Sequence, residues 1–393
     1  PPQGNDIMLG VIRQKMADRQ LLLADVAHRK TLTSGKPRLG YIGALGDANL
    51  GDEAMFTAAQ LLYPGYHLVT LLSNWREAEL ASKGLSGPDF FQGVILGGGT
   101  LISPYWHPAI AHAQQQGCRS WTLGSGIGSS GFGDEASVAL DGWAESLKQM
   151  SGVGLRGPRS LDTARTLGIG NAELIGDLAA ALTPNAPQQP HQRRKIVVNI
   201  AASAADNRLP QDIPALEAVT NYLRLADQFG DEVIGVAMHR TDGGPTRRVL
   251  DAAGLEHVSV QLPSDFAAFA KWVEGAHFTL SVRLHAAILA ANLGVPSISL
   301  GYRDKNLDFM QSIGQERWHL PLETASLDQV TLAIKAMEVE AVDEGVIAEI
   351  IVPEGSENVK VGAVIARLTV EGEEAAPAPA PAPAAAKEAA PAP

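Results

Sequence analysis

Cysteine and long apolar runs are what this sequence has least of. Cys118 is the only cysteine in 393 residues, which excludes an internal disulfide and a metal site built from several thiolates, and which fits a reducing compartment. No run of about 18 apolar residues, the length that a membrane-spanning helix needs, is present, and the N-terminus shows no basic-then-apolar targeting signal. We therefore expect a cytoplasmic protein without an integral membrane segment, with a peripheral place at the inner membrane as the alternative.

Basic residues are also in deficit. The 31 Lys and Arg residues stand against 43 Asp and Glu, which gives a formal net charge of −12. This balance argues against a broad surface for nucleic acid or anionic membrane, so an anionic ligand has to be bound in a local pocket. No residues with metal-ligand spacing are visible, and we expect neither a metal nor a cofactor. The sequence leaves a homo-oligomer open.

The length and the 45% share of apolar residues fit two domains plus appendages. From about residue 39, short apolar strands alternate with helical stretches, which predicts a parallel sheet with helices on both faces. After a polar, proline-rich break, a second series of the same kind begins. The predicted fold class is α/β, with two Rossmann-like halves. The predicted segments are a helical extension (1–36), a first half (37–182), a linker (183–194), a second half (195–336), a short β-rich segment (337–372) and an Ala/Pro-rich tail (373–393).

Ligands of such sheets bind beyond the carboxyl ends of the strands, so the residues that follow each strand are the ones to inspect. In the first half we expect strands near 39–42, 67–72, 93–96, 120–124, 152–155 and 173–175. In the second half we expect strands at 195–201, 232–238, 257–261, 277–281 and 296–300, and helices at 213–229, 245–253, 264–274 and 284–293.

Two basic side chains, Arg283 and His285, follow the strand at 277–281 and stand at a predicted helix N-terminus. Unpaired N–H groups and the helix dipole favour an anion there. The guanidinium adds bidentate geometry for carboxylate or phosphate, and the imidazole adds a proton that moves near neutral pH. The alternative is that Arg283 pairs with a structural carboxylate and that His285 is a core histidine.

The loop after the first strand enters a helix through Asn49, Asp52 and Glu53. These side chains offer hydrogen bonds or a general base. The alternative is structural, because acids in the first turn of a helix stabilise its dipole and Asn is a common loop residue.

Two glycine-rich turns follow later strands. Gly97, Gly98 and Gly99 end one strand, where backbone N–H groups could hold a phosphate. The stretch Gly124-Ser125-Gly126-Ile127-Gly128 suggests a dinucleotide site, but it lies in the middle of the half and lacks the full spacing, so we reject that interpretation.

Further basic residues leave neighbouring strands. Arg156 could bind a second anionic group, or it could form a salt bridge with Asp177. Lys305 should stand beside the basic pair of the second half, and His239 with Arg240 is a further candidate pair. Basic residues gathered at adjacent strand ends repel one another unless an anion is expected.

Several of these pieces occur together, in order, in a known family. They are Asn49-Leu50-Gly51-Asp52-Glu53, Gly97 to Gly99, Leu155-Arg156-Gly157-Pro158 followed by Gly176-Asp177, and Arg283-Leu284-His285 with Gly294-Val295-Pro296. Over roughly residues 37–320 the chain resembles the polysaccharide pyruvyl transferase family, most closely its bacterial exopolysaccharide branch. The resemblance implies two Rossmann-like halves in a GT-B-like arrangement. It also implies transfer of pyruvate from phosphoenolpyruvate to two hydroxyls of a sugar in an exopolysaccharide or cell-surface glycan, with a cyclic ketal and phosphate as products. The family's Arg-Leu-His motif, associated with the phosphoenolpyruvate site, maps onto Arg283 and His285.

The residues suit that chemistry. Phosphoenolpyruvate carries a carboxylate and a phosphate, so it needs two cationic anchors, which Arg283 with Arg156 or Lys305 could provide. His285 is the expected general acid toward the methylene carbon, and one of the two acids that follow Asn49 is the expected base. Phosphoenolpyruvate is then a co-substrate, and the saccharide acceptor is free or lipid-linked.

The last part of the chain has a different character. Residues 337–370 resemble the second half of a lipoyl domain from a dihydrolipoamide acyltransferase, and the tail from 375 resembles that enzyme's flexible linker. We do not expect lipoylation of Lys335, because Ile334-Lys335-Ala336-Met337 lacks the Asp and the Thr of the modified hairpin; Lys335 is expected to end a helix that begins near Ser326. The join is either a genuine fusion or a mis-joined reading frame.

Two other functions compete with this one. A GT-B glycosyltransferase would need a nucleotide pocket in the second half, and no acidic ribose-binding motif at a strand end supports it. A lipoyl-type carrier or interaction protein would place the function in the C-terminal segment.

Overall fold

A computed structural model describes residues 4–32, 35–128, 140, 142–183, 194–201, 213–301, 303–342, 346–350 and 366–369, with side chains from Met16 to Glu338 except that of Ala17. The chain divides into two compact units, residues 1–337 and 338–393. The predicted Ala/Pro-rich tail and all but the two end residues of the predicted linker lie outside the described residues.

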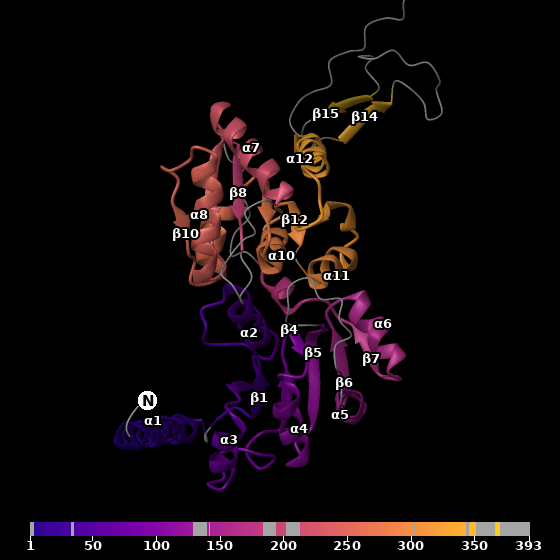
Figure 1. Cartoon of the computed structure of the whole chain (residues 1–393). Helices are drawn as coiled ribbons and strands as arrows, with labels where there is room; N and C mark the ends of the chain where they lie inside the picture. The colour runs from indigo at the N-terminus through magenta and orange to yellow at the C-terminus, as the bar shows by residue number, and fades with distance from the viewer. Residues whose placement is uncertain are drawn as a thin grey trace, which may run out of the picture. The chain divides into compact units, whose positions relative to one another are not determined.

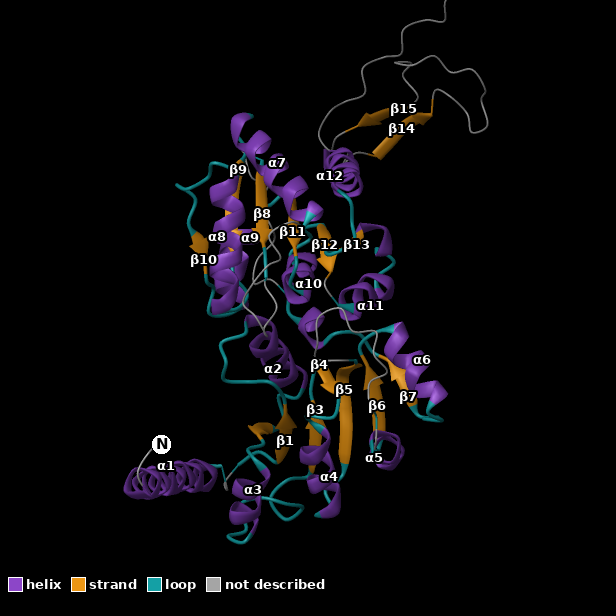
Figure 2. Cartoon of the chain, viewed as in Figure 1, coloured by secondary structure: helices purple, strands orange, loops and turns teal. Residues whose placement is uncertain are grey.

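A parallel sheet forms the first half of the larger unit (Figure 2). Its strands follow the order β2-β1-β3-β5-β6-β7, and β4 pairs with β5. The strands are β1 (Arg38–Ile42), β2 (His67–Thr70), β3 (Gly93–Leu96), β4 (Gly99–Ile102), β5 (Ser120–Ile127), β6 (Gly152–Leu155) and β7 (Ala172–Leu174). The connecting helices are α2 (Leu50–Leu62), α3 (Asn74–Ala81), α4 (His107–Gln115), α5 (Trp143–Gln149), α6 (Pro158–Thr166) and the 3-10 turn η1 (Leu178–Ala181).

A second parallel sheet forms the other half, in the order β10-β9-β8-β11-β12-β13. Its strands are β8 (Lys195–Asn199), β9 (Glu232–Val236), β10 (Val260–Gln261), β11 (Phe278–Ser281), β12 (Ser297–Gly301) and β13 (His319–Pro321). Its helices are α7 (Pro214–Gln228), η2 (Arg240–Asp242), α8 (Gly243–Ala252), α9 (Phe266–Val273), α10 (Leu284–Asn292), α11 (Asp304–Ser312), η3 (Glu316–Trp318) and α12 (Leu327–Val342).

Both sheets reverse their direction of winding at one point. In the first sheet the chain goes from β1 outward to β2 and then returns to the other side of β1 as β3. In the second it goes from β8 through β9 to β10 and returns beside β8 as β11. Connections that leave in opposite directions open a space at the carboxyl ends of the two central strands, which is where ligands of such sheets bind.

Three details differ from the sequence-based expectations. Residues Gly99–Ile102 form β4, whereas the sequence predicted only a turn after β3; a strand that begins with glycine resembles a loop in sequence. The elements α11 and β13 were not predicted. Helix α12 runs to Val342, so Lys335 lies inside it rather than at its end, and residues 337–342 are helical rather than part of a β-rich segment.

The hydrophobic core of the larger unit is continuous between the halves. Leu50 and Met55 of α2 belong to the same buried cluster as Leu284 and Ile288 of α10, together with Leu178 of η1. Burying these side chains together packs α2, η1 and α10 against one another, and α2 and α10 lie close together in Figure 1. Each fully buried Leu or Ile contributes about 1.5–3 kcal/mol, so this shared core holds the two switch points together.

The N-terminal extension is one helix, α1 (Gly4–Thr31). Its C-terminal turns pack on a small apolar cluster that includes Leu80 and Phe91. Buried Arg29 donates to both carboxylate oxygens of Glu77, at 2.9 and 2.6 Å. This paired charge fixes α1 against the first half, because breaking a buried ion pair is costly.

The smaller unit contains an antiparallel pair, β14 (Val346–Ile350) and β15 (Ala366–Thr369). Its register shifts between Ile347 and Glu349. Apart from residues 337–342, which belong to α12, the rest of the predicted lipoyl-like segment lies outside the described residues.

Candidate active site

His285 is the residue on which the two halves converge. Arg283 is the N-cap of α10, and His285 follows in the first turn, with a side chain that is 11% exposed. The imidazole packs on Gly51 at the start of α2: a Cβ built on Gly51 would lie 2.0 Å from Nδ1 of His285. Only glycine permits this approach, which is why an imidazole from the second half reaches the first turn of a helix of the first half.

Asp177 lies on the other side of the ring. Its side chain is fully buried, and its Oδ2 lies 3.7 Å from Nε2 of His285 and 3.9 Å from Nη1 of Arg156. Its Oδ1 accepts a hydrogen bond from the Ala179 N–H at 2.9 Å, which caps η1. Burial alone would raise the pKa of Asp177, but His285, Arg156 and the Ala179 N–H outweigh burial and the pKa is lowered. This carboxylate therefore stays ionised.

Arg156 is bound on several sides. Its Nη2 donates to Oγ1 of Thr100 at 3.4 Å, and its side chain is 2% exposed. A Cβ on Gly126 would lie 2.5 Å from Nη2, so the glycine-rich stretch after β5 makes room for a guanidinium rather than for a dinucleotide. The salt bridge to Asp177 that the sequence offered as an alternative is present. Nε of Arg156 is buried with no hydrogen-bond partner among the described residues.

The two adjacent acids of α2 have different surroundings. Burial and the charge of Asp177 raise the pKa of Asp52. His285, Lys305 and Arg283 lower it, but burial dominates and the net shift is upward. Oδ1 of Asp52 faces the glycine turn, 3.7 Å from a Cβ built on Gly99.

Glu53 instead accepts a hydrogen bond from the Gly46 N–H at 3.0 Å and so closes the loop before the helix. Asn49 is the N-cap of α2, and its Oδ1 accepts from the Gly51 N–H at 3.2 Å. From the sequence, Asp52 and Glu53 were equal candidates for the general base. In the structure they differ, because Glu53 accepts a hydrogen bond from the loop and Asp52 faces the glycine turn.

The glycine turn after β3 is closely approached by two side chains of the same half. A Cβ on Gly97 would lie 2.1 Å from the Tyr41 hydroxyl, and one on Gly98 would lie 2.3 Å from Sδ of Met55. The Gly98 N–H hydrogen-bonds to Tyr41, whose pKa is raised by burial. Gly99 has φ +100°, a conformation that favours glycine. The close approach of Tyr41 and Met55 is sufficient to explain the glycines at positions 97 and 98, and no ligand is needed to explain them. Gly99 brings the turn next to Asp52.

Arg283 has a carboxylate partner within its own half. Its Nε and Nη2 donate to Oδ1 of Asp242 at 3.1 and 2.6 Å. Asp242 is fully buried, and its Oδ2 also accepts from the N–H groups of Met238 and His239. The Arg283 N–H donates to Oδ1 of Asn199, the last residue of β8. This bidentate pair anchors the start of α10 at the switch point of the second sheet.

Other contacts cross between the halves. The Leu50 N–H donates to the Met238 carbonyl at 2.9 Å. Asp308 of α11 accepts from the Arg159 N–H at 2.8 Å and from the Ser160 hydroxyl at 3.1 Å, so a carboxylate of the second half caps α6 of the first. A Cβ on Gly157 would lie 2.1 Å from the Asp308 carboxyl carbon.

Lys305 lies on α11 as well, and its charge acts on Asp52. His239 and Arg240 lie further out, where both approach Asp47, at 3.3 and 3.5 Å.

Sequence reasoning missed two residues of this cluster. Asp242 and Asp308 are acids inside or just before ordinary helical stretches, and nothing local distinguishes them. Asp177 was considered as a partner of Arg156 and as part of the family motif Gly176-Asp177, but not as a partner of His285. Its position shortly after the end of β7, in Gly176-Asp177, was the available signal.

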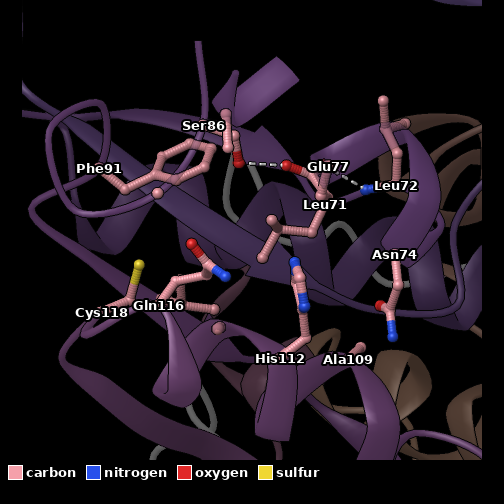
Figure 3. Close-up of a pocket in the computed structure, with 14 residues that line it drawn as sticks. Leu71, Leu72, Asn74, Glu77, Ser86, Phe91, Ala109, His112, Gln116 and Cys118 are labelled. Carbon is pink, nitrogen blue, oxygen red and sulfur yellow. Dashed lines mark hydrogen bonds between the residues drawn. The ribbon is translucent and has the colours of Figure 1, made fainter. Parts of the chain in front are cut away.

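A cavity elsewhere in the first half involves none of these residues. It lies beside α3 and α4, where Glu77, Ser86, His112 and Cys118 are among its lining residues (Figure 3). The Ser86 hydroxyl donates to Glu77, which also pairs with Arg29, so its most polar group is already satisfied. Among the described residues no group of three or more His, Cys, Asp or Glu could hold a metal ion. None of the helices that the structure describes is long and apolar enough to cross a membrane.

The fold is of the α/β class, with two parallel sheets whose strand ends bring an imidazole, two carboxylates and a guanidinium together. The family model for polysaccharide pyruvyl transferases matches residues 49–304, and the chain belongs to this family of transferases. The match contains every predicted site residue except Lys305.

Among solved structures, the MnaA–UDP co-structure from S. aureus is similar in fold, with a TM-score of 0.52 and 13% identity over 78% of this chain and 88% of that one. At this identity the likeness describes the fold alone. The expected α/β fold, with two Rossmann-like halves in a GT-B-like arrangement, is confirmed.

A short stretch matches proteins of another kind. Over 40 residues the chain is 65% identical to the dihydrolipoyllysine-residue acetyltransferase component of the pyruvate dehydrogenase complex from Rhizobium meliloti, which is 10% of this chain and 9% of the relative. The component from Rickettsia bellii is 66% identical over 38 residues, again 10% of this chain and 9% of the relative. The chain thus spans about a tenth of the length of these curated relatives, and the match supports a lipoyl-like segment only.

Proposed function

We propose that this chain transfers pyruvate from phosphoenolpyruvate to two hydroxyls of a sugar in a bacterial exopolysaccharide or cell-surface glycan, and that a cyclic ketal and phosphate are the products. One observation carries the proposal beyond the family: Asp52, with a raised pKa, interacts with the buried imidazole of His285. A carboxylate whose pKa is raised by burial, held near an imidazole, is the kind of pair that acid–base transfer needs.

The charges around this pair suit a substrate with two anionic groups. Arg156, Lys305 and Arg283 bring positive charge to the cluster, beside the carboxylates of Asp52, Asp177 and Asp242. The carboxylate and the phosphate of phosphoenolpyruvate would face these cations near the N-terminus of α10, whose dipole favours anions. Asn49 and the Gly97–Gly99 turn complete the proposed substrate-binding set.

The acid and the base are assigned by their surroundings. His285 is the proposed general acid. Asp52 is the proposed base, because burial favours its protonated form and so makes its carboxylate a stronger proton acceptor. Glu53 is already used by the Gly46 N–H, and its proposed role is to hold the loop before α2.

The proposed reaction balances in two steps. In the first, a sugar hydroxyl attacks the central carbon of phosphoenolpyruvate; its proton goes to Asp52, and His285 donates a proton to the methylene carbon, which becomes a methyl group. In the second, a neighbouring hydroxyl attacks the same carbon, the bond to the phosphate oxygen breaks, and the second hydroxyl proton goes to the departing phosphate. Asp52 then returns its proton to His285, which restores both side chains for the next turnover. The site's cations would stabilise the departing phosphate.

The test is phosphate release from phosphoenolpyruvate with a panel of pyranoside acceptors and a no-acceptor control. Acceptor-dependent release by the wild type, with ketal-linked pyruvate on the acceptor by mass spectrometry, is the expected result. H285A should lose about 10²–10⁴ of the rate, as expected for removal of a general acid.

H257A is the matched control, because the His257 side chain is 68% exposed. It should retain the wild-type rate. Absence of release with every acceptor, together with binding of a nucleotide sugar, would replace the proposal with a glycosyltransferase.

A further inference from the structure

Asp177 is a buried carboxylate shared by two cationic side chains from different halves. Its Oδ1 is occupied by the Ala179 N–H, so Oδ2 is the atom that faces His285 Nε2 at 3.7 Å and Arg156 Nη1 at 3.9 Å. All three side chains are almost inaccessible, with exposed fractions of 0%, 11% and 2%. Both distances exceed a hydrogen bond, so Asp177 acts on its partners by charge and placement.

The two nitrogens of His285 face different elements. Nε2 points to Asp177, which precedes η1, whereas Nδ1 lies against Gly51 in the first turn of α2. Asp52, the next residue of α2, is the other carboxylate that interacts with the ring. Arg283, the N-cap of the helix that carries His285, and Lys305 on α11 act by their charges on Asp52.

An ionised carboxylate can accept a proton but cannot donate one. Facing Nε2, it favours the neutral tautomer that carries the proton on Nε2 and leaves the Nδ1 lone pair on the side of α2. A ring fixed in this way exchanges its mobile proton through one nitrogen only.

We propose that Asp177 is a positioning residue that holds His285 in the Nε2–H tautomer, so that Nδ1 is the atom that donates the proton in the transfer reaction. The proposal rests on the proposed function for the identity of that reaction. When the imidazolium gives its Nδ1 proton to the methylene carbon, the Nε2–H form remains, and Asp177 stabilises the charged ring before the transfer without being protonated itself.

The substitution D177N separates this role from a structural one. Asparagine keeps the size and an oxygen that can accept the Ala179 N–H, so the cap of η1 survives. Its NH₂ group is a donor, and toward Nε2 it favours the opposite tautomer. The matched control is D265N, because Asp265 also caps a helix by accepting an N–H, from Ala268 at 2.8 Å, at a site far along the chain.

The experiment compares wild type, D177N and D265N by ¹⁵N-histidine NMR at a pH where His285 is neutral, with its signal identified by its loss in H285Q. We expect the Nε2–H tautomer in the wild type and D265N, and a shift toward Nδ1–H in D177N. The phosphate-release assay should show kcat of D177N lowered by about 10²–10⁴, with KM for phosphoenolpyruvate changed much less.

Each remaining outcome has a defined meaning. A D177N ring with the wild-type tautomer, or a wild-type kcat in D177N, would overturn the proposal. If the wild type releases no phosphate with any acceptor, the proposed function fails, while the tautomer comparison still decides the role of Asp177. If D177N does not fold, the charge-neutral double variant R156M/D177N removes the buried ion pair as a unit, and it should show the same change of tautomer.

Discussion

Gly51 and His285 meet where α2 of the first half begins beside α10 of the second. A Cβ on Gly51 would lie 2.0 Å from Nδ1 and 2.7 Å from Cβ of the histidine. The imidazole cannot retain this position if residue 51 has any side chain. Its orientation therefore depends on a glycine that lies 234 positions earlier in the sequence, the difference between the two residue numbers.

The first prediction concerns G51A. Alanine suits a helix better than glycine by about 1 kcal/mol, so any loss comes from displacement of the ring. We expect kcat to fall about 10²-fold, as for a reacting group moved by about an ångström, with the circular dichroism spectrum unchanged. G65A is the control, because a Cβ on Gly65 meets nothing within 4 Å. Equal activities of the two variants would show that the position of the imidazole does not depend on Gly51.

The second prediction separates the two acids of α2. D52N should lower kcat by about 10²–10⁴, the range for loss of a general base. E53Q should keep most of the activity and lower the melting temperature slightly, because its oxygen can still accept from the Gly46 N–H. Steady-state phosphate release on both variants decides the assignment; a larger loss in E53Q than in D52N would reverse it.

The sequence predicted the strand ends on which the site is built, because a parallel sheet brings its carboxyl ends together whatever the details of packing. Arg283, His285, Arg156 and Asp52 all lie there. What it could not predict is which charges pair. The Arg283 partner Asp242 lies 41 positions away, and only the tertiary fold brings the two side chains together.

The glycines show the same limit. Consecutive Gly97, Gly98 and Gly99 suggested a phosphate-binding turn, but a missing side chain does not reveal what fills its space. In the structure Tyr41 and Met55 fill it. Likewise β4 was missed because a strand that starts at a left-handed glycine has the composition of a turn.

The third prediction concerns pH. Burial lowers the pKa of His319 to about 4, with the Asp304 charge raising it and Arg159 lowering it further. Its unfolded value is 6.5, so between pH 6.5 and about 4 the unfolded chain takes up a proton that the folded chain does not. The neutral imidazole thus supports folding above pH 6.5, and this support is lost as the pH falls to about 4.

The loss should be on the order of 2–3 kcal/mol of unfolding free energy. H319Q removes the titration, so its unfolding free energy, measured in urea at a series of pH values, should fall less over this range than that of the wild type. H257Q, with its exposed histidine, should follow the wild type. Parallel curves for H319Q and the wild type would contradict the buried neutral histidine.

The last prediction compares two carboxylates of α11 that reach α6. Asp308 is 3% exposed and accepts from the Arg159 N–H and the Ser160 hydroxyl. Asp304 forms an ion pair with Arg159 at 3.1 Å between side chains that are 59% and 44% exposed. D308N loses a charged acceptor in a buried place and should lower the unfolding free energy by about 2 kcal/mol. D304N should change it by less than about 1 kcal/mol, since exposed ion pairs contribute little.

The same pair tests whether the contact between the halves supports the site. Arg156 directly precedes the segment that Asp308 caps, so loosening that cap should raise KM for phosphoenolpyruvate in D308N while D304N keeps the wild-type value. Urea unfolding and steady-state kinetics on both variants provide the two readouts. If D308N lost stability with an unchanged KM, the cap would stabilise the fold without positioning Arg156. If D304N were the more damaging variant, the buried cap would not be the contact that holds α6 to the second half.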